Sequence, residues 1–153
     1  MQVRRATKKD FEEMLEVQIA SFRTLTDTYS PDQIAAWEKR ATKKGGKRFE
    51  PYASLVCVEG GRIVAFATWG IKRDTGWLRC LYVLPRWMRK GIGSRLLKSA
   101  ERTMLDAGVR RIRIKSAPSA RPFYERHGYR YVEDGKSSAG FDVAIMKKAI
   151  PEG

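Results

Sequence analysis

Three closely spaced apolar runs in the middle of the chain constrain its fold most. They cover residues 53–58, 62–69 and 76–84, and their apolar residues are nearly continuous rather than alternating with polar ones. Strands covered on both faces show this pattern, whereas strands with one solvated face alternate. The pair Gly60-Gly61 separates the first two runs and predicts a hairpin. The chain is therefore expected to build a sheet with helices on both faces.

The segments around these runs supply the helices and the remaining strands. A second helix is expected to open at Ser30-Pro31-Asp32-Gln33, which has the Ser and Gln of a capping box and proline at the first helical position. The basic stretch 43–48 is predicted to be a surface loop. The other predicted elements are a strand over 3–6, a helix from about 8 to 22, a helix over 91–107, a strand over 110–115, a short helix over 119–127 and strands over 129–132 and 141–148. This order predicts a mixed α/β fold with one domain over residues 1–150.

Composition excludes several classes of protein. The chain has 153 residues, of which 42% are hydrophobic and 31% charged, and this is too apolar for a disordered chain. No apolar run reaches the roughly 18–20 residues of a membrane span, and the N-terminus lacks an apolar signal core, so we expect a cytoplasmic protein. Cys57 and Cys80 lie in apolar strand-like runs. Their context favours free buried thiols over a disulfide or a metal site.

The charge balance is strongly positive. Lys and Arg number 31 against 17 Asp and Glu, which gives a net charge of +14. A positive field attracts nucleic acid, acidic membrane surfaces and phosphorylated cofactors without choosing among them. The chain has no recognisable nucleic-acid-binding motif, and its charges are spread along the sequence. We therefore expect no specific nucleic acid and no membrane partner, and a basic nucleic-acid-binding module stays as an alternative.

A glycine turn follows the third apolar run, where Gly91 opens a helix. The first N–H groups of a helix have no internal partner and bind anions, and glycine at positions 91 and 93 lets a phosphate approach the backbone. Leu96 stands where a dinucleotide fingerprint needs a third glycine, and Gly93 is followed by Ser94-Arg95 rather than by Lys and Ser or Thr. The turn alone therefore does not identify its ligand.

A second motif downstream, FYERHGY at residues 123–129, gives the turn a specific interpretation. Together with VLP at 83–85 and MRKGIG at 88–93, it resembles the paired signature of the GNAT superfamily of N-acetyltransferases. The resemblance covers nearly the full chain and agrees with the predicted element order. It implies a single-domain α/β fold with a mixed, mostly antiparallel sheet that splays at its central strands. It also implies an acyltransferase that moves an acetyl group from acetyl-CoA, its cosubstrate, to a primary amine in a ternary complex.

The resemblance assigns residues to these roles. The pantetheine arm of acetyl-CoA is expected on the strand edge at Leu81, Tyr82 and Val83. The pyrophosphate is expected on the loop and helix start, at Arg89, Lys90, Gly91, Ile92, Gly93 and Ser94. Tyr124 is expected to donate a proton to the departing thiolate. The acceptor is an amine of a small molecule or a protein, and the enzyme is a monomer or a homodimer.

Three positions depart from the family pattern. Met88 stands where Gln or Arg is usual, Ala117 replaces an Asn, and Arg79 occupies the strand position that often carries a catalytic Glu. The base that deprotonates the amine is therefore open, and a water chain is one alternative. The side chains considered for this role are those of Asp27, Glu38, Asp74, Glu125 and His127, whereas Cys80 is considered either as a residue that faces the acetyl group or as a packed thiol. A catalytically inactive CoA-binding member of the same fold is a further alternative.

The acceptor pocket is expected to form from the first two helices, their connecting loop and the late strands. Arg23, Asp27, Tyr29 and Trp37 are its candidate residues, and packing roles for Tyr29 and Trp37 compete with this assignment.

Overall fold

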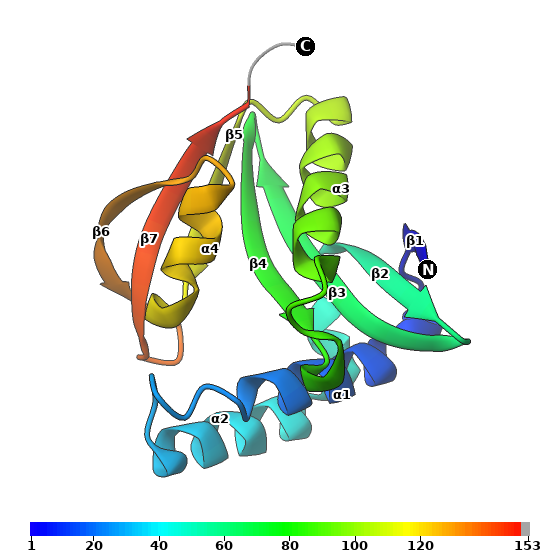
Figure 1. The fold of residues 1–153 in the computed structure, drawn as a ribbon, viewed down its shortest axis with the longest axis vertical. Helices are drawn as coiled ribbons and strands as arrows, with labels where there is room; N and C mark the ends of the chain where they lie inside the picture. The colour runs from blue at the N-terminus through cyan, green and yellow to red at the C-terminus, as the bar shows by residue number, and fades with distance from the viewer. Residues whose placement is uncertain (151–153) are drawn as a thin grey trace.

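The structure, a computed structural model, describes residues 1–150, which form a seven-stranded sheet and four α-helices (Figure 1). The strands are β1 (Gln2–Arg5), β2 (Ala53–Glu59), β3 (Arg62–Lys72), β4 (Thr75–Val83), β5 (Arg111–Ser116), β6 (Arg130–Lys136) and β7 (Asp142–Ala149). The helices are α1 (Phe11–Phe22), α2 (Pro31–Lys44), α3 (Ile92–Asp106) and α4 (Arg121–Arg126). Their order along the chain is the one predicted from the sequence. Among residues 1–150, no helix combines the length and apolarity that a membrane span requires.

The sheet splays at its centre, as the resemblance implied. Its strand order is β1-β2-β3-β4-β5-β7-β6, and all neighbours are antiparallel except the parallel pair β4 and β5. This pair is short, because only Thr75–Leu78 of β4 pairs with Arg111–Ile114 of β5. Beyond Leu78, β4 continues on β3 and β5 continues on β7, so the two strands diverge toward one end (Figure 1).

Helices cover both faces of the sheet, as predicted. Helix α3 packs through a fully buried stripe of Leu96, Leu97, Ala100 and Met104. Successive side chains of β4 point to opposite faces. Cys80 lies next to Gln18 of α1. The Val83 side chain points to the opposite face, where it lies beside Gly93 of α3, and Gly93 is close to Phe123 of α4. Helices α1 and α2 therefore lie on one face, and α3 and α4 lie on the other.

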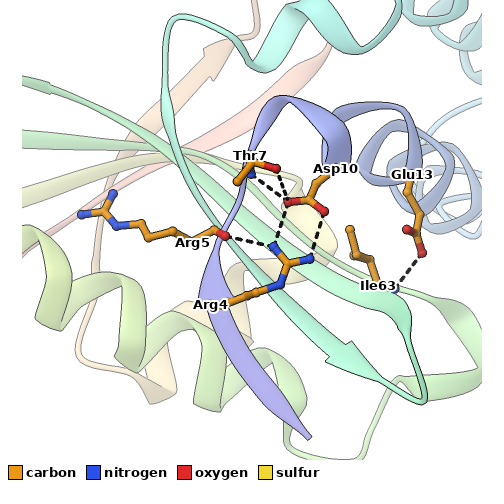
Figure 2. A network of polar contacts seen from close by, with 6 residues as sticks. All are labelled: Arg4, Arg5, Thr7, Asp10, Glu13 and Ile63. Carbon is orange, nitrogen blue, oxygen red and sulfur yellow. Dashed lines mark hydrogen bonds and ion pairs between the residues drawn. The ribbon is translucent and has the colours of Figure 1, made fainter.

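A polar network fixes the start of α1 to the sheet (Figure 2). The Arg4 guanidinium donates to both oxygens of Asp10, with Nη1–Oδ2 and Nη2–Oδ1 distances of 2.8 and 3.0 Å. The Thr7 N–H also donates to Asp10 Oδ2 at 2.7 Å. The hydrogen bonds from Arg4 are the main reason that the pKa of Asp10 is lowered. One turn further on, Glu13 Oε2 accepts the Ile63 N–H of β3 at 2.7 Å, so α1 is held at two strands.

The cap of α2 is the one predicted. The Gln33 N–H donates to Ser30 Oγ at 3.1 Å, and Gln33 Oε1 accepts the Ser30 N–H at 2.9 Å. The hairpin at Gly60-Gly61 also forms, with φ of 57° and 77° at the two glycines.

The prediction of a surface loop over residues 43–48 was wrong. Helix α2 continues to Lys44, and Gly45–Phe49 form a 3-10 helix packed on α1. The buried Gly46 donates its N–H to Glu12 Oε1 at 2.8 Å, and a Cβ at this position would lie 2.8 Å from the Phe11 Cβ. Composition indicated flexibility, whereas glycine here permits close packing. This packing places the half-buried Arg48 against Gln18 of α1.

Candidate active site

A cavity of about 1030 Å³ lies where β4 leaves β5. Its walls come from the end of β4, the start of α3 and α4 on one side, and from α1, α2, the 3-10 helix and the β6–β7 connection on the other, where Phe141 packs on Phe22 and Tyr29. Of the residues predicted to bind or react, those that line it are Leu81, Tyr82, Val83, Arg89, Gly93 and Tyr124. Lys90, Gly91, Ile92 and Ser94 lie in the adjoining loop and helix start and do not line it.

The edge of β4 that faces the cavity has no strand partner. Thr68 of β3 pairs with Cys80 and Trp69 pairs with Leu78, so Arg79 is an extra residue in a β-bulge. The β5 ladder ends at Leu78, one residue before the bulge. Backbone groups of β4 beyond this point are therefore available to an extended ligand, which would bind as an added strand does.

The start of α3 is a ready anion site. Gly91 caps the helix with φ of +80°, and Arg89 has φ of +62°, a conformation that is uncommon for a residue with a side chain. The first helical hydrogen bond runs from the Arg95 N–H to the Gly91 carbonyl at 3.1 Å. The N–H groups of the three residues between them therefore have no acceptor within the helix. Together with the exposed side chains of Arg89 and Lys90, they favour a phosphate group.

Tyr124 presents a protonated hydroxyl at this cavity. Its ring is 7% exposed and packs edge-on against Phe123 and Tyr129, with ring centroids 5.2 and 5.7 Å away. Burial raises the pKa of Tyr124, and the nearby Tyr82 and Cys80 add to the shift. Within residues 1–150, no side chain or backbone group forms a hydrogen bond with its hydroxyl. The group is therefore free to donate to a substrate atom.

Two of the four candidate acceptor residues line the cavity. Trp37 stacks on Phe22 with a centroid distance of 4.0 Å, and the Tyr29 hydroxyl donates to the Asp142 carbonyl at 3.0 Å. Both residues are buried, so they pack in the core and form the wall at once. Asp27 does not line the cavity. Arg23 also lies outside it, in an ion pair with Glu38.

None of the carboxylates or the histidine considered as a base lines the cavity. Arg23 donates to Glu38 at 2.6 and 2.9 Å, and Asp74 pairs with Arg111 at 3.7 Å in the β3–β4 turn. Glu125 lies 3.4 Å from Arg121. His127 Nε2 lies 2.9 Å from Ser94 Oγ, and burial lowers the pKa of His127.

The described walls of the cavity carry positive charge without carboxylates. Among residues 1–150, no Asp or Glu lines the cavity, whereas five cations do: Lys44, Arg48, Arg79, Arg89 and Lys115. Cys80 also lines it, and burial raises the pKa of its thiol to about 11, so it is neutral at pH 7. In the same part of the chain, no cluster of three or more His, Cys, Asp or Glu could hold a metal ion.

Sequence reasoning missed Gln18 and Arg48. The Arg48 Nη1 donates to Gln18 Oε1 at 2.8 Å, and Gln18 Nε2 lies 3.8 Å from the Cys80 Sγ. Gln18 stands on the buried face of α1 with Met14 and Leu15, and a polar residue in an apolar stripe was a usable signal. Arg48 offered no such signal, because its position depends on the packing of the 3-10 helix.

Comparison with known proteins identifies the family. Residues 25–150 match the model of the acetyltransferase (GNAT) domain, and the chain belongs to this family. The uncharacterized N-acetyltransferase YafP of Escherichia coli (strain K12) is 26% identical over 134 residues, which cover 87% of this chain and 83% of YafP. The chain is thus an acyltransferase with acetyl-CoA as its cosubstrate, which confirms the class expected from the sequence.

Solved structures agree with this fold. A GCN5-related N-acetyltransferase from Rhodopseudomonas palustris superposes with a TM-score of 0.87 at 22% identity, over 97% of this chain and 95% of that one. PaiA N-acetyltransferase from Thermoplasma acidophilum, solved in complex with coenzyme A, has a TM-score of 0.82 at 24% identity, over 97% and 98% of the two chains.

Proposed function

We propose that this chain transfers the acetyl group of acetyl-CoA directly to a primary amine, with both substrates bound in the cavity at once. The observation that carries the proposal is the meeting of three features in one cavity: the unpaired edge of β4, the N-terminus of α3 and the hydroxyl of Tyr124. When bound, acetyl-CoA supplies an activated thioester carbonyl. The chain then has to bind the cofactor, stabilise the carbonyl oxygen and move protons.

Binding falls to backbone groups. Leu81, Tyr82 and Val83 hold the pantetheine arm along the free edge of β4, and the segment 89–94 holds the pyrophosphate. A backbone N–H near the Arg79 bulge stabilises the negative charge that develops on the carbonyl oxygen. Gly93 supports this assignment, because its lack of a side chain leaves the helix start open beside Phe123 and Val83.

Proton transfer falls to Tyr124 and water. The amine nitrogen bonds to the carbonyl carbon, the carbon–sulfur bond breaks, and Tyr124 donates its proton to the departing sulfur. Water removes the proton that the amine must lose, since no carboxylate of the described chain lines the cavity. The surrounding cations assist this step, because like charges lower the pKa of an ammonium group. This first proton passes to solvent, and the second, which the nitrogen loses after it bonds to the carbonyl carbon, restores Tyr124.

Calorimetry and an amine panel test this proposal. Titration with acetyl-CoA should give saturable heat, and at least one primary amine should release free CoA thiol and gain one acetyl group by mass spectrometry. Absence of heat with millimolar acetyl-CoA contradicts the proposal. Thiol release that is equal with and without every amine also contradicts it, since that result describes a hydrolase.

A row of cations on the sheet supports a second candidate function, the binding of a polyanion. Lys147 of β7 pairs in register with Arg113 of β5 and with Arg130 of β6, so three cations lie side by side across three strands. Titration with a DNA duplex at several salt concentrations tests it. Three phosphate contacts predict a slope of roughly −3 in log K against log salt, and no binding at low salt removes this candidate.

A further inference from the structure

The half of the cavity formed by α1 and α2 carries an excess of positive charge. Lys44, Arg48 and Arg79 line this half, and no Asp or Glu among residues 1–150 lines any part of the cavity. Arg48 is half-buried, whereas Lys44 and Arg79 are exposed. A buried or half-buried guanidinium normally has an acidic partner, because desolvation of an unpaired charge is unfavourable.

Neutral groups hold Arg48 in place. Its Nη1 donates to Gln18 Oε1 at 2.8 Å, and its guanidinium carbon lies 5.8 Å from the ring centroid of Trp37 and 5.7 Å from that of Phe49. Within residues 1–150, no Asp or Glu forms an ion pair with Arg48. The remaining N–H groups of this guanidinium form no hydrogen bond with that part of the chain. Arg48 is therefore fixed in position and lacks a counter-charge.

Arg48 lies close to the reacting centre of the proposed mechanism. Gln18, its hydrogen-bond partner, also contacts the Cys80 Sγ at 3.8 Å, and Cys80 follows the bulge of β4. Arg79 forms that bulge, and its guanidinium carbon lies 4.5 Å from the ring centroid of Tyr52. The two cations thus flank the point on β4 where the acetyl group is expected.

The phosphates of acetyl-CoA do not account for this charge. Their proposed site at 89–94 lies with Gly93 against Val83, on the α3 face of the sheet, whereas Gln18 contacts Cys80 on the α1 face. A second anion, brought by the other substrate, accounts for it directly. Guanidinium groups bind carboxylate and phosphate through paired hydrogen bonds, and they repel an acceptor that is itself a polycation.

We infer that the acceptor of this enzyme carries a carboxylate or phosphate group near its amine, and that Arg48 binds this group with help from Arg79. The inference rests on the proposed acetyl transfer and names its substrate class. It makes Arg48 a residue that determines specificity.

Matched pairs of amines test the substrate class. Phosphoethanolamine is compared with ethanolamine, β-alanine with its amide, and spermidine represents polycations; each is assayed for release of CoA thiol and, in saturating CoA, for binding by calorimetry. The anionic member of at least one pair should have a kcat/KM roughly 10- to 100-fold above its neutral partner. The phosphate and carboxylate pairs show which of the two groups the site prefers.

Substitution of Arg48 tests the residue. Arg48→Met should remove most of the preference for the anionic member, and Arg48→Lys should restore part of it. Arg40→Met removes the same charge from the exposed face of α2 and should change nothing. All three variants should keep the wild-type affinity for acetyl-CoA, which also shows that they are folded.

The outcomes separate the two proposals. No heat with acetyl-CoA overturns the transfer reaction and the acceptor class with it. Acetylation of ethanolamine or spermidine as fast as of the anionic amines leaves the transfer reaction standing and overturns the acceptor class. Failure of both anionic amines to bind or react overturns the acceptor class as well, as does a preference that survives Arg48→Met.

Discussion

The two halves of the cavity offer different groups to a ligand, backbone groups in one half and side chains in the other. On the α3 side, the groups offered to a ligand belong mainly to the backbone: the open edge of β4 beyond Leu78 and the N–H groups that follow Gly91. On the α1–α2 side, the walls are side chains, with Arg48 held between Gln18 and the rings of Trp37 and Phe49. Backbone groups suit the cosubstrate, which is always acetyl-CoA, whereas side chains can make the other half specific for one particular acceptor.

Tyr124 lines the cavity from α4, and its loss should have the largest effect. Tyr124→Phe removes the hydroxyl and keeps the ring that packs on Phe123 and Tyr129. We expect kcat to fall by roughly 100-fold or more, the contribution typical of a general acid, while the Kd for acetyl-CoA stays within about twofold because no binding contact is lost. Steady-state kinetics and calorimetry measure the two constants.

Tyr131→Phe is the control for this substitution. Tyr131 is an exposed tyrosine on β6 whose hydroxyl donates to Asp134 at 2.8 Å, outside the cavity. Its removal should leave kcat unchanged. Tyr124→Phe with wild-type kcat would exclude this hydroxyl as the proton donor.

Gly93→Val should weaken ligand binding in the α3 half of the cavity alone. A Cβ at Gly93 would lie 3.6 Å from the Phe123 ring, an ordinary contact, but the two further methyl groups of valine must displace Phe123, Val83 or the ligand. We expect the Kd for acetyl-CoA to rise by roughly tenfold or more, in line with an overpacked contact. Gly93→Ala is the matched control and should show a much smaller change by calorimetry. Equal effects of Ala and Val would mean that space at Gly93 does not limit binding.

Arg4→Met should loosen the attachment of α1, which carries Gln18. Two hydrogen bonds from Arg4 to Asp10 are lost, and because the Arg4 side chain is 38% exposed we expect only about 1 kcal/mol less stability at pH 7. The folded-state pKa of Asp10 is lowered chiefly by Arg4, so its stabilising contribution is present above the unfolded pKa and is lost as pH falls through the folded pKa. Urea unfolding at pH 7 and in acid measures this. A difference between wild type and variant that does not shrink in acid would contradict the role of Asp10.

Cys80 should matter least, although it lines the cavity. Burial raises the pKa of its thiol to about 11, so the thiolate is scarce at neutral pH. We expect Cys80→Ala to keep kcat within about threefold, the cost of its weak contact with Gln18. Between about pH 6 and 9, the pH profile of kcat should match that of the wild type. A large loss of activity would instead indicate covalent acyl transfer through this sulfur.

The sequence predicted more of the α3 half of the cavity than of the α1–α2 half, for a physical reason. Residues 88–93 and Tyr124 belong to short contiguous motifs, and such motifs determine the local backbone of a turn and a helix start. The contact between Gln18 and Arg48 joins residues 30 positions apart through their side chains, and it exists only once Gly46 packs on α1. Neither periodicity nor composition reports a contact of this kind. The same stretch, Lys43 to Arg48, was therefore predicted to be a loop when it is part of the cavity wall.

The base that deprotonates the amine could not be predicted from the sequence, for a similar reason. Five side chains could be proposed from position along the chain, but Glu38, Asp74 and Glu125 form ion pairs, His127 lies beside Ser94, and none of the five lines the cavity. The element order, by contrast, follows from apolar runs and turn residues and was predicted correctly, and the splay of β4 and β5 agrees with what the family resemblance implied.

The most direct test of the central claim compares Gly93→Val with Arg48→Met for the Kd of acetyl-CoA and the KM of an amine. The claim is that the α3 half binds acetyl-CoA and the α1–α2 half binds the acceptor. Gly93→Val should raise the Kd for acetyl-CoA and leave the KM for an anionic amine such as phosphoethanolamine within about twofold, and Arg48→Met should do the reverse. If each variant weakens both substrates equally, or if Arg48→Met weakens acetyl-CoA alone, the division of the cavity is contradicted.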